Sequence, residues 1–384
     1  MFESFRHPLY KYKNSWEKAR TYIIDQFQSY GLEIYKQSFR TQVTTHDNTI
    51  TEVNGVNIIG ESQSVDKRSS VILFGTHYDN SLTENPLHEN GASLAILLET
   101  ARLFQEMRQN EALHQNTTVI FVTFDIDTRN YIPSGPGKPG SYFFIQEWLL
   151  NYLDGREFTG AFIIDSVSRF NWQNKTQDLI KGMQQVFPNA VNVIGSSGYK
   201  ANFLAVFSRP DKANQKEVER LIWTNEEVND DKRLRMVRFI LRDGIVIPIE
   251  LITRIKRTQV IDFWSNPKPL PALLITDLGN SRRDFDEESC SDLCNAEDFL
   301  KIRRKEILQK LTMTLLQTAI YHQHILDGNH MHGRNSSSQE KVSIFRVIPL
   351  QHLINNGHGP LFFFIKKERT MYMSRKVLNC FNIC

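Results

Sequence analysis

Three nearly continuous apolar runs stand at Val71-Ile-Leu-Phe-Gly75, Val119-Ile-Phe-Val-Thr-Phe124 and Ala161-Phe-Ile-Ile-Asp165. Such runs are typical of strands that are buried on both faces of a sheet. Apolar residues at helical spacing fill Ala92 to Met107, between the first two runs, and Ser141 to Tyr152 predicts another helix before the third. Alternating strands and helices predict an α/β fold with a mostly parallel central sheet, covered by helices on both faces.

The flanking segments extend this pattern. Trp16 to Tyr30 has helical spacing and stops at Gly31, a residue that commonly follows a helix end. Further elements are expected as strands at Leu32–Phe39, Val56–Gly60 and Pro271–Thr276, and as a long closing helix at Ala296–Leu326. The segment 328–340 is rich in Gly, Ser, Asn and His, which indicates a linker. We therefore expect one α/β domain at 1–327, a linker at 328–340 and a basic tail at 341–384.

Charge is distributed unevenly along the chain. The net charge is +3, and the part from Gly328 onward holds eight Lys/Arg and two Asp/Glu, so +6 lies there and −3 on the rest. The main domain therefore lacks the basic surface of a nucleic-acid-binding protein, and we expect no nucleic-acid partner. Met1 to Lys13 has no signal-peptide core, and Leu361 to Ile365 is too short to span a bilayer. Because the opening residues run almost directly into a helix, we expect either a longer natural precursor or an incomplete gene model.

Polar side chains follow the ends of the apolar runs. His77 and Asp79 follow the first run, and a neutral imidazole with a nearby carboxylate is a frequent zinc-binding arrangement. Glu89 lies beside the start of the next helix, Asp127 follows the second run, and Asp165 ends the third. Since ligands of parallel α/β sheets bind beyond the carboxyl ends of the strands, we expect these residues to meet at one rim. Helix capping accounts for any one of these acids, but less well for the whole set.

Over Trp16 to Leu326 the chain resembles the M28 family of zinc aminopeptidases. The resemblance is carried, in order, by nine pieces: Asn57-Ile-Ile-Gly60, Gly75-Thr-His-Tyr-Asp79, Gly91-Ala-Ser93, Phe121-Val-Thr-Phe-Asp125, Gly140-Ser141, Ile163-Ile-Asp165, Ala201-Asn-Phe-Leu-Ala-Val206, Asp262-Phe-Trp264 and Pro271-Ala-Leu-Leu-Ile-Thr-Asp277. In that family two zinc ions share a bridging carboxylate, and a Glu acts as general base. The resemblance implies His77, Glu89 and Asp165 as ligands of the first zinc ion, with Asp79 in support.

The second half of the family's site is changed. The resemblance places Asp127 at the general-base position and Thr128 where a Glu ligand of the second zinc ion is expected. The final His ligand corresponds best to Asp286, a weak second-site ligand, and Thr258-Gln-Val260 stands where the family has Ser-Asp-His. We therefore expect at most one zinc ion as cofactor rather than two.

These changes predict an M28 metallopeptidase-like domain with weak or no aminopeptidase activity. One alternative is an active aminopeptidase that uses a single zinc ion, and another is a non-catalytic protein-binding domain. In each case the expected partner is a peptide or protein in the rim cleft. The resemblance suggests a secretory or lumenal location, although no signal peptide or transmembrane segment is present in the chain as given.

Overall fold

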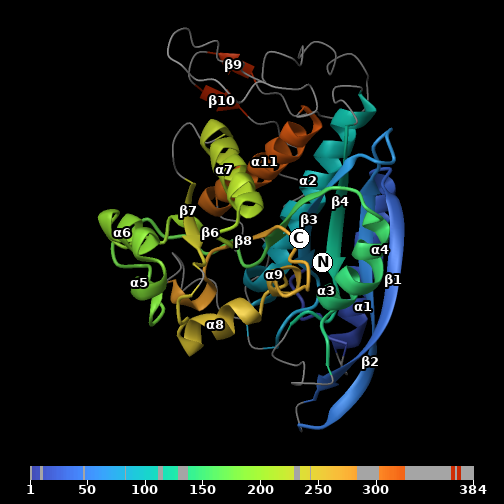
Figure 1. Ribbon diagram of the computed structural model, residues 1–384, viewed down its shortest axis with the longest axis horizontal. Coiled ribbons are helices and arrows are strands. Elements are labelled where there is room, and N and C mark those ends of the chain that lie inside the picture. The colour runs from blue at the N-terminus through green and yellow to red at the C-terminus, as the bar shows by residue number, and fades with distance from the viewer. Residues whose placement is uncertain are drawn as a thin grey trace.

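The computed structural model shows an eight-stranded mixed sheet with the strand order β1-β2-β4-β3-β5-β8-β6-β7 (Figure 1). It describes residues 2–8, 12–45, 48–82, 84–110, 116–128, 137–228, 234–242, 244–282, 302–324, 365–367 and 370–372. The strands are β1 Glu33–Thr44, β2 Ile50–Ser62, β3 Ser70–His77, β4 Thr117–Phe124, β5 Phe158–Ile164, β6 Phe203–Ser208, β7 Arg235–Ile240 and β8 Ala272–Thr276.

The four central strands, β4, β3, β5 and β8, are parallel to one another. β6 and β7 are also parallel to each other. The antiparallel pairs are β1 with β2, β2 with β4, and β6 with β8. The parallel centre brings the carboxyl ends of four strands to one rim. This confirms the prediction of an α/β fold with a mostly parallel central sheet.

Helices cover both faces of the sheet (Figure 1). One face is covered by α1 Lys13–Ser29, α2 Ala92–Gln109, α7 Lys212–Val228 and α11 Ile302–His324. The other is covered by the continuous helix of α3 Gly140–Phe143, η4 Phe144–Leu149 and α4 Leu150–Leu153, and by α5 Met183–Val186, α6 Pro188–Ser196, α8 Ile249–Lys256 and α9 Val260–Trp264. A π-helical turn, η2 Leu87–Gly91, leads directly into α2.

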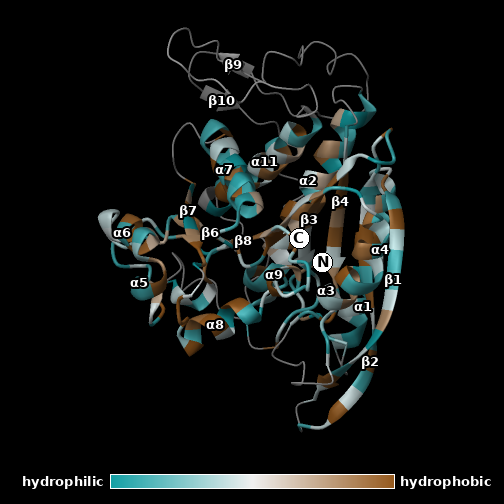
Figure 2. Cartoon of the chain, viewed as in Figure 1, coloured by the Kyte–Doolittle hydropathy of each residue, from teal (hydrophilic) through white to brown (hydrophobic). Residues whose placement is uncertain are grey.

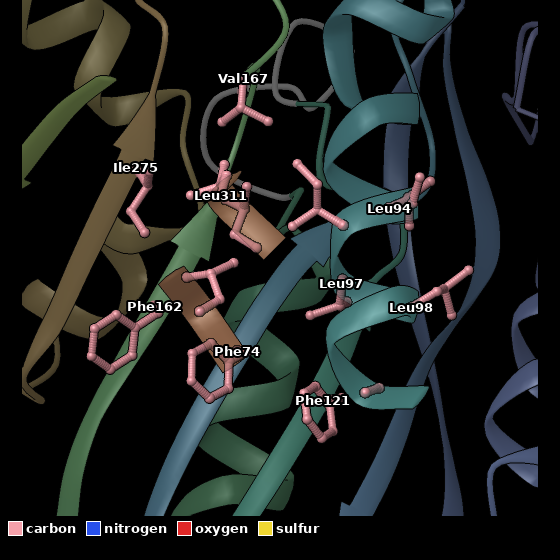
Figure 3. Packing of buried hydrophobic residues seen from close by; sticks show 14 of the residues in the cluster. Phe74, Leu94, Leu97, Leu98, Phe121, Phe162, Val167, Ile275 and Leu311 are labelled. Carbon is pink, nitrogen blue, oxygen red and sulfur yellow. The ribbon is translucent and has the colours of Figure 1, made fainter. Parts of the chain in front are cut away.

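The core explains why the strand sequences are apolar without interruption. Ile72 and Phe74 of β3 pack into the cluster beneath α2 and α11, whereas Val71 and Leu73 pack on the opposite face. Phe74 stacks on its neighbours Phe121 and Phe162, with ring centroids 5.8 and 5.2 Å apart (Figure 3). Each such buried ring contributes on the order of 2–3 kcal/mol. Figure 2 shows the same layering, with apolar residues concentrated on the central strands and polar residues on outward helix surfaces.

The structure refines several predicted bounds. The strands predicted at Leu32–Phe39 and Val56–Gly60 are longer, because β1 and β2 form a 12-residue antiparallel ladder. The predicted helix at Ser141–Tyr152 is present but contains the π-helical segment η4. Two strands, β6 and β7, were not predicted as strands; β7 is an edge strand with only partial burial, so its pattern is weak.

Some predicted segments fall outside the described residues. Asp286, the first part of the predicted closing helix and the linker at 328–340 are among them. In the basic tail, the backbone is described only for the short antiparallel pair β9 Ile365–Lys367 and β10 Thr370–Tyr372. Among the helices of the described chain, none has the length and apolar character needed to cross a bilayer.

Candidate metal centre

The site lies where the central parallel strands end. His77 is the last residue of β3, Asp127 lies three residues after β4, and Asp165 follows β5 directly. All three are held by elements buried in the core, so their backbones are fixed by the sheet. The structure thus brings the predicted rim residues of three neighbouring strands to one edge.

The imidazole of His77 lies between two carboxylates. Its Nδ1 atom is 3.4 Å from Oδ1 of Asp79, and its Nε2 atom is 3.5 Å from Oδ1 of Asp165. The side chain of His77 is 5% exposed and that of Asp165 is 18% exposed. Burial alone would lower the pKa of His77, but the two carboxylates outweigh it and raise this pKa well above its ordinary value.

The separation of His77 and Asp165 tests whether these residues fit a metal ion. Hydrogen bonds of the N–H···O type usually span about 2.7–3.2 Å, so 3.5 Å is long for one. Two ligand atoms that each lie about 2.1 Å from a tetrahedral zinc ion are about 3.4 Å apart. The distance between His77 Nε2 and Asp165 Oδ1 matches this separation between two ligand atoms of one zinc ion. Asp79 lies at the other ring nitrogen of His77, as an orienting carboxylate does. This pair therefore fits one zinc ion.

Glu89, the third expected ligand, is bound to a neighbouring loop. Both of its carboxylate oxygens accept the backbone N–H of Ser81 at 2.9 Å, and Oε2 also accepts the Ser81 hydroxyl at 3.0 Å. Burial raises the pKa of Glu89 to about 7, although the nearby His77 and Ser81 oppose the shift. Across the described ranges, no three His, Cys, Asp or Glu side chains are arranged to hold a metal ion. In this arrangement the carboxylate of Glu89 is bound to the loop that holds Ser81.

Asp127 faces the start of a helix. Its Oδ2 atom accepts the backbone N–H of Ser141 at 2.6 Å, and its Oδ1 atom accepts the Ser141 hydroxyl at 3.0 Å. Ser141 lies in the first turn of the helix that begins at Gly140, so Asp127 acts as its cap. The Ser141 hydroxyl also contacts Oδ2 of Asp262 on α9. The carboxylate at the general-base position is therefore bound within the protein.

The neighbouring position also argues against a second metal ion. The hydroxyl of Thr128 is buried and has no hydrogen-bond partner among the described residues. A hydroxyl is not among the usual zinc ligands, which are Cys, His, Asp and Glu. Thr128 is positioned by its backbone N–H, which donates to Oδ2 of Asp79 at 2.9 Å.

Asp79 contacts residues at the ends of two neighbouring strands, β3 and β4. Besides facing His77, it accepts the backbone N–H of Asp127 at 3.0 Å and that of Thr128. Burial would raise its pKa, but His77 and these two N–H groups outweigh it, so the pKa of Asp79 is lowered. Asp79 therefore stays ionised and ties the loop after β4 to the end of β3.

The backbone geometry at this rim was not predictable from local sequence patterns. Ile126, Ser166 and Leu278 each follow an Asp at the end of a central strand, and their φ angles are 49°, 50° and 69°. Positive φ is costly for residues other than Gly and is concentrated at functional sites. The sharp turns bring the strand-end aspartates and the backbone that follows them to the rim.

Several buried residues around the site were missed at the sequence level. Arg6 and Asn90 are fully buried and hydrogen-bonded to one another beside His77. Asp277 is buried after β8 and accepts the backbone N–H groups of Ser168 and Arg169. Nothing in the local sequence around Arg6 signals burial, whereas Asn90 lies between the predicted ligand Glu89 and the Gly91-Ala-Ser93 piece of the family resemblance.

Comparison with known proteins adds family and fold information. The family model described as Peptidase family M28 matches residues 57–213. No curated protein sequence matches the chain. A glutaminyl cyclase from Macrostomum lignano is similar in structure, with a TM-score of 0.53 and 12% identity, over 83% of this chain and 86% of that one.

Two further solved structures are similar at lower scores. They are a Zn-dependent exopeptidase from Parabacteroides distasonis, with a TM-score of 0.45 and 14% identity over 79% of this chain and 89% of that one, and an aminopeptidase from Aneurinibacillus sp., with a TM-score of 0.47 and 12% identity over 80% and 88%. At these identities the likeness concerns the fold.

Proposed function

Because residues 57–213 belong to peptidase family M28, we propose that this is an M28 metallopeptidase-like domain with weak or no aminopeptidase activity. The observation that carries the proposal is the state of Asp127. Its carboxylate accepts the backbone N–H of Ser141 in the first turn of the helix, and it shares the single hydroxyl proton of Ser141 with Asp262.

A general base has to reach the proton that it removes. Asp127 is one methylene shorter than the Glu that the resemblance leads us to expect, and its two oxygens point to Ser141. A misplacement of about 1 Å in a catalytic group can cost roughly 100-fold in rate. Releasing Asp127 from Ser141 adds a further cost, because it leaves a buried N–H without its acceptor. Both effects act against hydrolysis.

The metal part of the proposal is one zinc ion held by His77 and Asp165, with Glu89 as a third ligand after release from Ser81. When bound, zinc acts as a Lewis acid and lowers the pKa of a bound water. Asp79 orients the His77 ring through Nδ1, which leaves Nε2 directed at Asp165. The residues thus support one ion, and we propose that the second ion of the family is absent.

The His77–Asp165 geometry also favours a second candidate, an active aminopeptidase that uses one zinc ion. This candidate keeps the same ligands but requires Asp127 to turn from Ser141 toward the rim. In both cases a peptide or protein at the rim is the proposed partner, and a secretory or lumenal compartment is the proposed location, supported by the family resemblance.

The decisive experiment measures metal content and hydrolysis together. Zinc in the purified full-length chain is counted by elemental mass spectrometry for the wild type, His77→Ala and the control His322→Gln. His322 lies on α11, with its Nε2 atom 3.0 Å from Oε2 of Glu217 on α7. A panel of aminoacyl substrates follows, with one N-terminal glutaminyl peptide because a structural neighbour is a glutaminyl cyclase.

We expect about one zinc ion per chain in the wild type and the control, and none in His77→Ala. Hydrolysis should be near background. Robust hydrolysis that His77→Ala abolishes would favour the one-zinc aminopeptidase instead. A wild-type protein without zinc would refute the metal site and leave protein binding as the role to test.

A further inference from the structure

The N-terminal residues 2–8 form part of the wall behind the metal site. Arg6 is the largest fully buried side chain of the described residues. Its backbone N–H donates to Oδ1 of Asn80 at 2.7 Å, and its carbonyl accepts the Asn80 N–H at 2.8 Å. Nε of Arg6 donates to the carbonyl of Tyr78 at 2.8 Å. Arg6 therefore contacts the chain on both sides of Asp79.

The guanidinium of Arg6 also fixes the side chain of Asn90. Nη2 of Arg6 donates to Oδ1 of Asn90. The opposite end of that amide, Nδ2, donates to the carbonyl of His77 at 3.0 Å and to the carbonyl of Asp79 at 2.5 Å. Rotating the amide by 180° would set an NH₂ group against the guanidinium and two carbonyls against Oδ1. Arg6 thus fixes which end of Asn90 faces the site.

Asn90 has a central place among the expected metal-site residues. It follows Glu89 in the π-helical turn, it bonds the backbone of His77 and Asp79, and its Nδ2 lies 3.2 Å from His77 Nδ1. The carbonyl of Glu89 accepts the backbone N–H of Ser166, the residue after Asp165, at 3.1 Å. A short chain of hydrogen bonds therefore connects Arg6 with the backbone of every expected first-site residue.

We propose that Arg6 is a positioning residue for the metal site: through Asn90 and Tyr78 it sets the backbone positions of His77, Asp79 and Glu89. The metal-binding part of this inference rests on the proposed function, whereas its backbone part does not. Arg6 touches neither the rim carboxylates nor a substrate in any contact described above, so its action is indirect.

The chemistry of the guanidinium explains why an arginine occupies this position. Its planar fork presents five N–H donors at fixed angles, and here the donors reach Tyr78, Asn90 and the carbonyls of Phe2 and Ser4. A lysine carries the same charge on one nitrogen, which cannot occupy the positions of Nε and Nη2 together. Charge alone therefore does not replace Arg6.

A purely structural role of Arg6 is the alternative, in which the segment 2–8 serves only to cover Phe2 and its neighbours. This role predicts that the rim segment 76–91 does not respond to the loss of the Arg6 guanidinium. The matched control for this role is Arg156, whose Nε donates to the carbonyl of Ser69 at 3.0 Å and whose Nη2 donates to Thr118 at 2.7 Å. Arg156 anchors the starts of β3 and β4, at the opposite end of the sheet from the rim. Removing it tests the loss of an anchoring guanidinium away from the site.

The experiment compares the full-length wild type with Arg6→Met, Arg6→Lys and Arg156→Met. Hydrogen–deuterium exchange of the metal-free proteins is followed in peptides that cover residues 76–91, with a peptide that covers β6 as internal reference. Binding of Co²⁺ is then titrated by its visible absorption, which reports both affinity and coordination geometry. Cooperative urea unfolding confirms that each variant is folded.

We expect Arg6→Met and Arg6→Lys to raise exchange in 76–91 at least tenfold, to weaken Co²⁺ binding at least tenfold and to change its spectrum. Arg156→Met should leave all three unchanged, and β6 should not respond in any variant. Unchanged exchange in 76–91 with Arg6→Lys overturns the proposal, even if Arg6→Met does not fold. If exchange in 76–91 rises in the Arg6 variants but the wild type binds no metal, the zinc site is refuted, whereas Arg6 is supported as a positioning residue of the rim.

Discussion

Replacing Asp127 by Ala tests whether this carboxylate serves the helix or the rim. The change removes an acceptor from the Ser141 N–H at 2.6 Å and from the Ser141 hydroxyl at 3.0 Å, both fully buried. Hydrogen bonds to a charged group contribute about 1.5–3 kcal/mol each, and loss of a helix cap costs about 0.5–2 kcal/mol. These contributions overlap, so we expect the free energy of unfolding to fall by roughly 2–4 kcal/mol.

The assay is equilibrium urea unfolding of the metal-free full-length chain, followed by tryptophan fluorescence and far-UV circular dichroism. Asp165→Ala is the matched control, because Asp165 is also a strand-end aspartate but is partly exposed and contacts His77 at 3.5 Å. We expect this control to lower the free energy of unfolding less than Asp127→Ala does, because Asp165 is partly exposed and His77 keeps Asp79 as its other carboxylate partner.

The reasoning fails if Asp127→Ala leaves stability unchanged or increases it. Catalytic residues often hold unfavourable positions, and their removal commonly stabilises a protein. A stabilising substitution would therefore show that Asp127 belongs to a working site rather than to the helix start, and it would favour the one-zinc aminopeptidase.

Three further predictions concern pH, packing and modification. Burial raises the pKa of Glu89 and of Asp125 to about 7, so folding disfavours their ionised forms. The free energy of unfolding of the metal-free chain, measured in urea, should therefore fall as pH rises from about 5 to about 7. A free energy of unfolding that does not change over this pH range would contradict the prediction. Gly140→Ala should destabilise by about 2–3 kcal/mol in the same assay, because its Cβ would lie 2.1 Å from the carbonyl oxygen of Asp125. Asn174-Lys-Thr176 and Asn116-Thr-Thr118 both match the acceptor pattern for N-glycosylation. In a secretory expression host, Asn174→Gln should remove a glycosidase-sensitive shift in electrophoretic mobility, because Asn174 is exposed, whereas Asn116→Gln should not, because Asn116 Nδ2 donates to the carbonyl of Gln323. The reverse pattern would contradict this prediction.

Features that depend on periodicity were predictable from the sequence. The alternation of apolar strands with amphipathic helices has a direct physical basis in burial on two faces, and it led to the α/β fold and to the rim as the location of the site. The edge strand β7 lacked such a signal because only part of its surface is buried. The residues His77, Asp79 and Asp165 could be placed together because parallel strands end at one rim.

Side-chain direction was beyond the reach of the same reasoning. Both Asp127 and Glu89 lie where the strand and helix ends predict, yet each carboxylate is bound by a serine from another segment, Ser141 and Ser81. Arg6 was missed for a related reason: its partners at the rim, Tyr78 and Asn90, lie more than 70 positions along the chain, and no local pattern reports such contacts.

The hydrogen bonding of the rim bears on how this domain exists without metal. A cluster of buried carboxylates is tolerated only when its members are paired, hydrogen-bonded or protonated. Asp79 is ionised between His77 and two backbone N–H groups, Glu89 is held by Ser81 with a raised pKa, and Asp127 is held by Ser141. Each of these carboxylates therefore has a partner within the protein itself. The same bonds oppose catalysis, because recruiting Glu89 and Asp127 to a metal-bound substrate means breaking contacts that already satisfy them. Under the proposed function, a scaffold stabilised in this way keeps a shaped rim for a peptide or protein, and its hydrolytic activity is weak or absent.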